Sequence, residues 1–332
     1  MQWDCFVHGL LSVIPVYFRL QIIACVNPRR LAGGGFLSEG VQRMRVAIVT
    51  DTNSGISVAE GAALGVFVLP MPLLVDGKIR YEGVDLTADE FYAAQQAGRS
   101  VSTSQPSPGD VMDLWDRVLE EHDALVYIPM SSGLSASCQT AIALAEGYGG
   151  RVQVADLRRI SVTQKLAVLD GVELAKLGCS AVEIREELER ISMDAMIYIG
   201  VETLTYLRRG GRITPAAAAM GNLLNIKPLL KIQGERLDVC AKVRGVKACK
   251  QRAVEATRED VERYLQKGWY FHVGTAHTYR TREEIQEWQQ TLEDNVPGLP
   301  ASHGELALSI GCHTGPGAFG MGLVRRVDLP GR

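Results

Sequence analysis

The sequence of 332 residues has no clustered cysteines and few histidines, and these shortages exclude several kinds of site. Its seven cysteines are scattered along the chain and never stand in Cys-x-x-Cys spacing. A disulfide scaffold or a zinc ribbon needs clustered cysteines, so neither is expected. The six histidines include no His-x-x-x-His pair, and we predict no metal and no other cofactor. Scattered thiols are typical of a reducing compartment, which predicts a cytoplasmic protein with buried free cysteines.

An excess of positive charge is also absent, and aromatic residues are scarce. The formal net charge is -3, and aromatic residues make up 6% of the chain. Nucleic acids and anionic membranes bind basic surfaces, so neither is expected as a partner. The longest apolar stretch, residues 10–26, is interrupted by Pro15 and Arg19 and is shorter than the ~20 residues of a spanning helix. We therefore predict no stable membrane span.

Residues 1–43 differ from the rest of the chain and lack a domain pattern. A glycine run at residues 33–35 follows the apolar stretch, and a globular pattern begins abruptly at Met44. The segment has neither the basic start nor the small-residue cleavage site of a signal peptide. We interpret Met44 as the natural start and residues 1–43 as translated upstream sequence. The alternative is a genuine, poorly ordered extension, and N-terminal sequencing of the native protein would distinguish the two.

Short apolar runs alternate with helical patterns over residues 44–198. The expected buried strands are residues 46–49, 66–75, 124–129 and 152–155. Helical patterns lie between and after them, including one at residues 134–146. This alternation is typical of an α/β fold in which helices cover both faces of a parallel sheet. The sequence therefore predicts an N-terminal α/β/α domain.

The pattern changes over residues 199–326. Gln233-Gly234 separates two strand patterns and predicts a hairpin. A long helix is expected over residues 245–267, and further strands over residues 306–310 and 317–324. Such an order indicates a second α/β domain with a mixed sheet, a boundary near residue 198, and a ligand cleft between the two domains.

Two hydroxyl-rich segments follow expected strands. Ser131 and Ser132 stand between a strand and the next helix, and Ser102 and Thr103 stand in an extended segment before a proline. We expect both segments at strand ends of one parallel sheet, where ligands commonly bind. Hydroxyls and free backbone N–H groups at a helix start favour an anion such as a carboxylate. Ordinary capping or turn formation is the alternative for each segment.

The remaining candidate binding residues are three arginines and one histidine. Arg208, Arg209 and Arg212 flank two glycines, which predicts a tight, exposed loop that could pair with phosphate. His313 is expected after a strand, where it could donate to an anion. A solvated basic turn and a structural histidine are the alternatives. The chain has no Gly-x-Ser-x-Gly elbow, no Walker A loop and no Gly-x-Gly-x-x-Gly after the first strand, so no catalytic or nucleotide-binding motif stands out.

Several short motifs occur together in one order along the chain. They are residues 50–52, 103–106, 131–135, 207–213, 221–228, 242–245 and 313–317. With these motifs the chain resembles the DegV family of bacterial fatty-acid-binding proteins from residue 44 to about residue 326. The chain departs from the usual family pattern at Leu157, where a serine is common, and at Ala136, where a glycine is common.

The resemblance implies two α/β domains with one long-chain fatty acid buried between them. It implies that hydroxyls of the Ser102-Thr103 and Ser131-Ser132 segments hold the carboxylate, with His313 nearby. Some members of the family present the fatty acid to a separate ATP-dependent fatty-acid kinase, which makes an acyl phosphate for phospholipid synthesis. The resemblance therefore implies that the chain is a carrier rather than an enzyme. It also implies that the loop of Arg208, Arg209 and Arg212 serves the encounter with the kinase, Arg212 above all.

The residues themselves leave two other functions open. The first is an acyl hydrolase or transferase that uses Ser131 or Ser132 with His313, against which the missing nucleophile elbow argues. The second is a subunit of a small-molecule kinase that resembles dihydroxyacetone kinases and would need a polar sugar pocket. A lipid that co-purifies with the protein would exclude the second function, and a serine-reactive phosphonate would detect the first.

Overall fold

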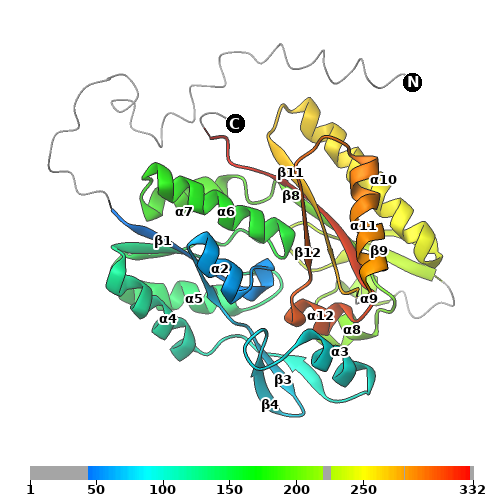
Figure 1. The fold of residues 1–332 in the computed structure, drawn as a ribbon, viewed down its shortest axis with the longest axis horizontal. Helices are drawn as coiled ribbons and strands as arrows, with labels where there is room; N and C mark the ends of the chain where they lie inside the picture. The colour runs from blue at the N-terminus through cyan, green and yellow to red at the C-terminus, as the bar shows by residue number, and fades with distance from the viewer. Residues whose placement is uncertain (1–43, 220–225, 280, 330–332) are drawn as a thin grey trace.

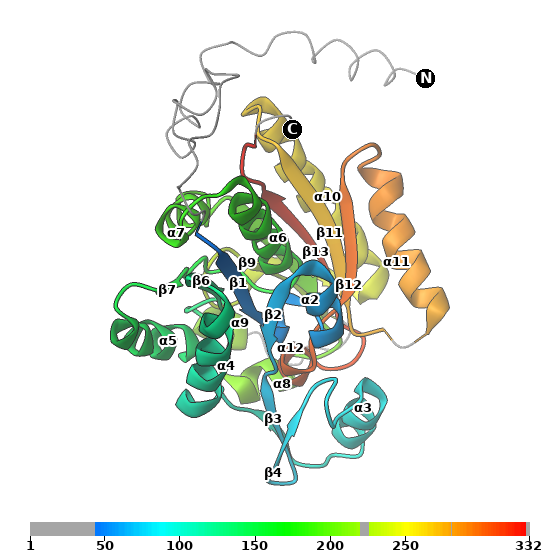
Figure 2. The same cartoon turned by 60° about the vertical axis from the view of Figure 1, so that its left-hand side comes forward.

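A computed structural model describes residues 44–219, 226–279 and 281–329 of the chain. The expected extension over residues 1–43 and the start of the motif at 221–228 lie outside the described residues. The described chain forms three sheets. A parallel sheet and a mixed sheet lie next to each other, and a small third sheet lies at one end of the molecule (Figures 1 and 2).

The parallel sheet has four strands, and helices cover both of its faces. In spatial order the strands are β2 (Val66–Leu69), β1 (Val46–Asp51), β6 (Ala124–Ile128) and β7 (Val152–Val154). The helices are α2 (Val58–Leu64), α4 (Pro108–Glu121), α5 (Ser137–Ala145), α6 (Val162–Leu177) and α7 (Ala181–Arg190). The predicted α/β/α arrangement is confirmed. Short 3-10 turns, Thr52–Ser54 and Glu146–Tyr148, follow β1 and α5.

Successive side chains of the central strands enter opposite cores. Ile48 and Val126 pack in the core under α6 and α7, whereas Val49 and Tyr127 pack in the core under α4 and α5. Strands buried on both faces read as continuous apolar runs, which is why these strands are recognisable in the sequence.

Side-chain caps fix where several helices begin. Ser57 and Ser107 accept hydrogen bonds from the first turns of α2 and α4, and Pro108 occupies the first position of α4. Thr87 and Ser180 form capping boxes at the starts of α3 (Ala88–Gln96) and α7. Helix α5 starts at Ser137, later than expected, because residues 131–135 form a hydrogen-bonded turn first.

The mixed sheet has six strands. In spatial order they are β10 (Asp238–Arg244), β9 (Ile226–Ile232), β8 (Ala195–Gly200), β13 (Phe319–Arg325), β11 (Phe271–His277) and β12 (Ala301–Glu305). Helices α10 (Gly245–Gln266) and α11 (Arg282–Asn295) pack on one face, and α6 contacts the other face through Val162 and Leu166. The predicted hairpin is β9–β10. Residue 198, the expected domain boundary, lies inside β8, and the division into two domains stays a prediction.

The third sheet is antiparallel, with the order β4 (Lys78–Tyr81), β3 (Pro72–Val75) and β5 (Val101–Thr103). The expected strand at residues 66–75 is therefore two strands in two sheets, separated at Pro70. Ser102 and Thr103 lie on β5. Their expected position at a strand end of the parallel sheet is wrong, because the chain leaves that sheet after β2 and returns only at β6.

The expected strand at residues 306–310 is also wrong. Helix α12 (Leu308–Thr314) occupies this part of the chain, and it carries His313. Leu308 and Cys312 pack against the small sheet and α3, whereas Leu306 and Ile310 pack on the core beside the mixed sheet. Burial on two sides leaves no single apolar stripe, so the helical period is hidden in the sequence. Helices α8 (Thr205–Gly210) and α9 (Pro215–Ala218) lie beside α12 and β10 respectively.

Candidate ligand-binding site

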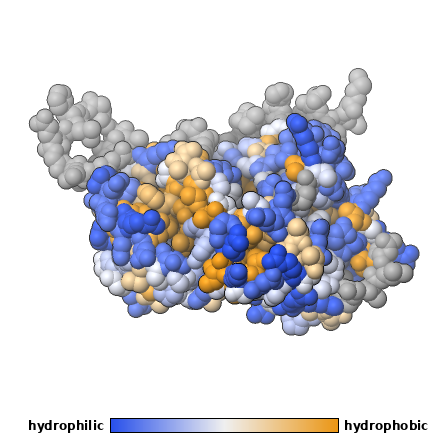
Figure 3. Space-filling view, turned by 60° about the horizontal axis from the view of Figure 1, so that its bottom comes forward, coloured by the Kyte–Doolittle hydropathy of each residue, from blue (hydrophilic) through white to orange (hydrophobic). Residues whose placement is uncertain are grey.

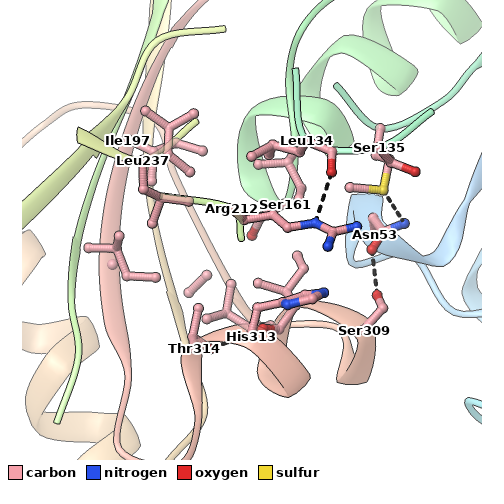
Figure 4. A pocket seen from close by; sticks show the side chains of 18 of the residues that line it. Asn53, Leu134, Ser135, Ser161, Ile197, Arg212, Leu237, Ser309, His313 and Thr314 are labelled. Atoms are coloured by element: carbon pink, nitrogen blue, oxygen red, sulfur yellow. Dashed lines mark hydrogen bonds between the residues drawn. The ribbon is translucent and has the colours of Figure 1, made fainter. Parts of the chain in front are cut away.

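A cavity lies where the parallel sheet, the mixed sheet and α12 meet. The space inside it is about 930 Å³, including the part that is open to solvent. Figure 4 shows the cavity from close by, with walls contributed by both larger sheets and by α12.

Most of the wall is apolar. These side chains come from many elements, among them β8, β9, the loop after β6 and α12. The apolar lining residues are Met71, Met130, Leu134, Ile160, Val162, Ile197, Ile199, Leu207, Ile232, Leu237, Ala276, Leu306, Ile310 and Met321. Ile197 and Leu237 lie at the end away from the labelled polar side chains Asn53 and Ser309 (Figure 4). The cavity is therefore amphipathic along its length.

The polar end opens toward solvent. Ser104 and Gln105 line the cavity and are exposed, and Ser135 and Arg212 line it and are partly exposed. No aspartate or glutamate is among the lining residues of the described chain. A ligand with an anionic head and a long apolar tail matches this division. On the face seen from the β3–β4 side, apolar side chains reach the surface between hydrophilic regions (Figure 3).

Thr103 and His313 meet at the polar end. The Thr103 hydroxyl and Nε2 of His313 are 3.0 Å apart, although 210 residues separate them in the chain. Burial, and to a lesser extent the positive charge of Arg212, lowers the pKa of His313 to about 4. The imidazole is therefore neutral near pH 7. An anion bound there would favour the protonated form, because opposite charges stabilise each other.

Gly210 makes room for the histidine ring. A Cβ atom on Gly210 would lie only 2.0 Å from Nδ1 of His313. The next residue, Gly211, has a φ of 68° and ends α8 in the left-handed conformation that favours glycine. The two glycines of the arginine motif therefore have different roles, one in close packing and one in ending the helix.

The three arginines of that motif point to different places. Arg208 and Arg209 are exposed in the last turn of α8, and the Arg208 guanidinium donates to the Ala218 carbonyl at 2.5 Å. Arg212 turns inward and lines the cavity, where its Nε donates to the Leu134 carbonyl at 3.2 Å. The expected exposed loop is thus a helix end, and only Arg212 of the three lines the cavity.

The predicted serines lie outside the cavity lining. Ser131 is buried, and its hydroxyl donates to the Gly234 carbonyl of the β9–β10 hairpin at 2.9 Å. Gly133 packs against the same hairpin, since a Cβ there would lie 2.7 Å from that carbonyl oxygen. Ser132 is half-buried beside this contact, and Ser102 is exposed on β5. The Ser131 segment therefore joins the two larger sheets, and His313 bonds Thr103 rather than Ser131 or Ser132.

Sequence reasoning missed three polar residues that line the cavity. Asn53 follows β1, Ser161 precedes α6, and Ser309 lies on α12. The Ser309 hydroxyl donates to Oδ1 of Asn53, and the Asn53 carbonyl accepts from the Ser161 amide at 2.8 Å. Asn53 comes directly after the first strand, and this position in the sequence could have marked it as a candidate binding residue. Isolated serines such as Ser161 and Ser309 carry no such signal.

Within the described ranges, no group of three or more His, Cys, Asp or Glu side chains is placed to hold a metal ion. None of the described helices has both the length and the apolar character needed to cross a membrane. The five cysteines that the structure describes are free thiols, four of them buried, as predicted for them.

Known proteins resemble this chain over nearly all of its described length. The profile of the DegV family, described as uncharacterised proteins, matches residues 45–326. A DegV domain-containing protein of Deinococcus radiodurans is 35% identical over 281 residues, which cover 84% of this chain and 98% of that protein.

Two solved structures share both the fold and part of the sequence. A DegV family protein from Thermus thermophilus, described for its fatty acid binding, matches with a TM-score of 0.76 and 32% identity, covering 85% of this chain and 100% of that chain. DegV from Bacillus subtilis, described as a fatty acid binding protein, matches with a TM-score of 0.75 and 26% identity, again covering 85% and 100% of the two chains. The predicted two-domain α/β fold agrees with these structures.

Proposed function

The chain belongs to the DegV family, and on this basis we propose that it binds one long-chain fatty acid in the cavity between its two larger sheets. The observation that carries the proposal is the amphipathic cavity itself, apolar over most of its length and polar at its open end. The description of the similar Thermus and Bacillus proteins as fatty acid binding supports the same ligand class.

The energetics favour such a ligand. A C16 tail carries about 15 carbons, and at ~0.8 kcal/mol for each buried CH₂ its burial favours binding by about 12 kcal/mol before ordering costs. The head group then needs only neutral donors and one nearby charge. The Thr103 hydroxyl, held by its hydrogen bond to His313, supplies a donor, and Arg212 supplies the charge. We place the carboxylate at this end, where it faces the mouth of the cavity.

Mass spectrometry of lipid extracted from the purified protein tests this function. We expect saturated or monounsaturated fatty acids in stoichiometric amount, and re-binding of hexadecanoic acid after delipidation. A protein that neither carries nor re-binds a fatty acid would exclude the proposal. Labelling of Ser131 or Ser132 by a serine-reactive phosphonate would instead indicate an acyl hydrolase or transferase.

We further propose that the chain presents the bound carboxylate to a fatty-acid kinase in the cytoplasm. An acyl group bound tail-first leaves its carboxylate at the mouth, where a second protein could phosphorylate it. The exposed Arg208 and Arg209 lie on the helix that ends beside Arg212, so the positive surface continues from the outside to the cavity. Acyl-phosphate formation with the kinase of the source organism tests this step. Arg209→Ala should lower turnover at least tenfold and leave fatty-acid affinity unchanged.

A further inference from the structure

The first turn of α6 opens on the cavity. Ile160, Ser161 and Val162 are three consecutive residues that all line it, and α6 begins at Val162. Helix α6 has 16 residues, and no side chain caps its N-terminus. The amide groups of the first turn of a helix have no partner within the helix and carry partial positive charge.

Ser161 is a largely buried polar residue at this position. It is only 6% exposed, yet its hydroxyl has no hydrogen-bond partner among the described residues, while its backbone N–H donates to the Asn53 carbonyl. The hydroxyl is not among the fully buried side-chain atoms that lack a partner, so its oxygen is accessible from the cavity. The hydroxyl lies in the cavity lining, so a ligand in the cavity would satisfy it (Figure 4).

The backbone of Ser161 is strained. Its φ of 56° and ψ of -139° fall among conformations that glycine adopts readily and other residues rarely do. Glycine at this position would relieve the strain, but it would remove the hydroxyl from the cavity. Strain of this kind is typical of ligand-binding positions, where it persists because the side chain is needed.

Ser161 and the predicted carboxylate-binding residues lie on connected walls. Asn53 accepts from the Ser161 amide through its backbone and from Ser309 through its side chain. Ser309 stands one helical turn before His313 on α12. The cavity therefore has hydrogen-bond donors on two sides. Helix α12 and β5 supply the donors of one side, and the start of α6 supplies those of the other.

We propose that Ser161 and the first turn of α6 form a second set of donors to the carboxylate of the bound fatty acid, in addition to Thr103 and His313. The inference rests on the proposed fatty-acid binding and adds a specific anchor to it. The strained Ser161 is retained, in this view, for the carboxylate rather than for folding.

Delipidated Ser161→Gly tests the inference. We expect it to melt at a higher temperature than the unmodified protein and to bind hexadecanoic acid at least tenfold more weakly. Binding of 1-hexadecanol, which has the same tail and no charge, should change by less than threefold. Ser161→Ala keeps the backbone strain and lacks the hydroxyl, so it should show the same loss of acid binding without the gain in melting temperature.

Arg158→Gly is the matched control. Arg158 also has a positive φ, 53°, three residues earlier, but it does not line this cavity. Its replacement by glycine should leave the affinity for hexadecanoic acid within twofold. If Ser161→Gly and Ser161→Ala bind the acid as tightly as the unmodified protein does, the role of Ser161 is overturned and the proposed fatty-acid binding is unaffected. Equal losses for the acid and the alcohol would show that Ser161 acts through shape, which also overturns it. Failure of the unmodified protein to bind the acid would overturn the proposed function and this inference with it.

Discussion

Replacing Gly210 by alanine tests whether the histidine ring and the arginine motif form one unit. In an ordinary helix this change stabilises the protein by up to about 1 kcal/mol, because alanine has the higher helix propensity. Here the new Cβ would lie 2.0 Å from Nδ1 and 2.7 Å from Cε1 of His313. The ring would have to move by more than 1 Å, and the 3.0 Å contact with Thr103 would break.

The expected magnitude follows from these opposing effects. Loss of the Thr103 contact costs about 1 kcal/mol, and forcing the ring aside costs about 1–3 kcal/mol. The helix gain offsets at most about 1 kcal/mol of this. We therefore expect Gly210→Ala to lower the free energy of unfolding by about 1–3 kcal/mol. It should also weaken fatty-acid binding, since His313 leaves its position.

A double-mutant cycle with His313→Ala decides the cause, with urea unfolding of delipidated protein as the assay. In the His313→Ala background the clash is absent, so Gly210→Ala should become neutral or stabilising by about 0.5–1 kcal/mol. Gly211→Ala is the control: its cost comes from a φ of 68°, and no atom lies within 4 Å of its Cβ position. That cost should be the same in both backgrounds. If Gly210→Ala destabilises both backgrounds equally, the steric argument fails.

Three further predictions test the cavity. Thr103→Val should weaken binding of hexadecanoic acid by about 1–3 kcal/mol, because the carboxylate loses a hydroxyl donor. Fluorescent fatty-acid titration measures this loss. Ser132→Ala in the same assay tests the serine that lies outside the cavity lining. The pKa of His313 is lowered to about 4 from 6.5, so the unfolded chain takes up a proton first as the pH falls. The delipidated protein should therefore lose stability between about pH 6.5 and pH 4, and His313→Gln should remove that part of the loss in urea unfolding at several pH values. Ile197→Phe fills the apolar end of the cavity, so it should weaken binding of C18 acids more than that of C12 acids, and equal losses in competition titrations would place the tail elsewhere.

Local signals predicted most of the fold. The buried apolar runs that form β1 and β6 depend on neighbouring residues only, and the structure confirms both as strands. Helix α12 was missed because it packs between two cores and has no polar face along which a helical period would show.

The site was harder to predict because tertiary contacts define it. Thr103 and His313 are named as candidates by residue type and by the family motifs, but their contact joins two elements that are far apart in the chain. The role of the Ser131 segment as a contact to the β9–β10 hairpin depends on Gly234, which no local pattern connects to it. Ser161 could not be found at all, since nothing in a sequence shows that a serine has a positive φ.

The arginine motif joins the inside of the cavity to the outside of the protein, and this affects how its variants are to be interpreted. Gly210 admits the His313 ring, and Gly211 ends α8 so that Arg212 turns back to the cavity while Arg208 and Arg209 stay exposed. Loss of Arg212 would remove a charge near the ligand and also raise the pKa of His313, because Arg212 is one of the two causes of its shift. A fall in acyl-phosphate formation by Arg212→Ala therefore cannot be assigned to the kinase contact until fatty-acid affinity is measured in the same variant. Arg209→Ala changes only the exposed side of the motif. A loss of turnover at unchanged affinity in that variant would assign the outer surface to the partner, whereas a loss confined to Arg212→Ala would assign the motif to the ligand.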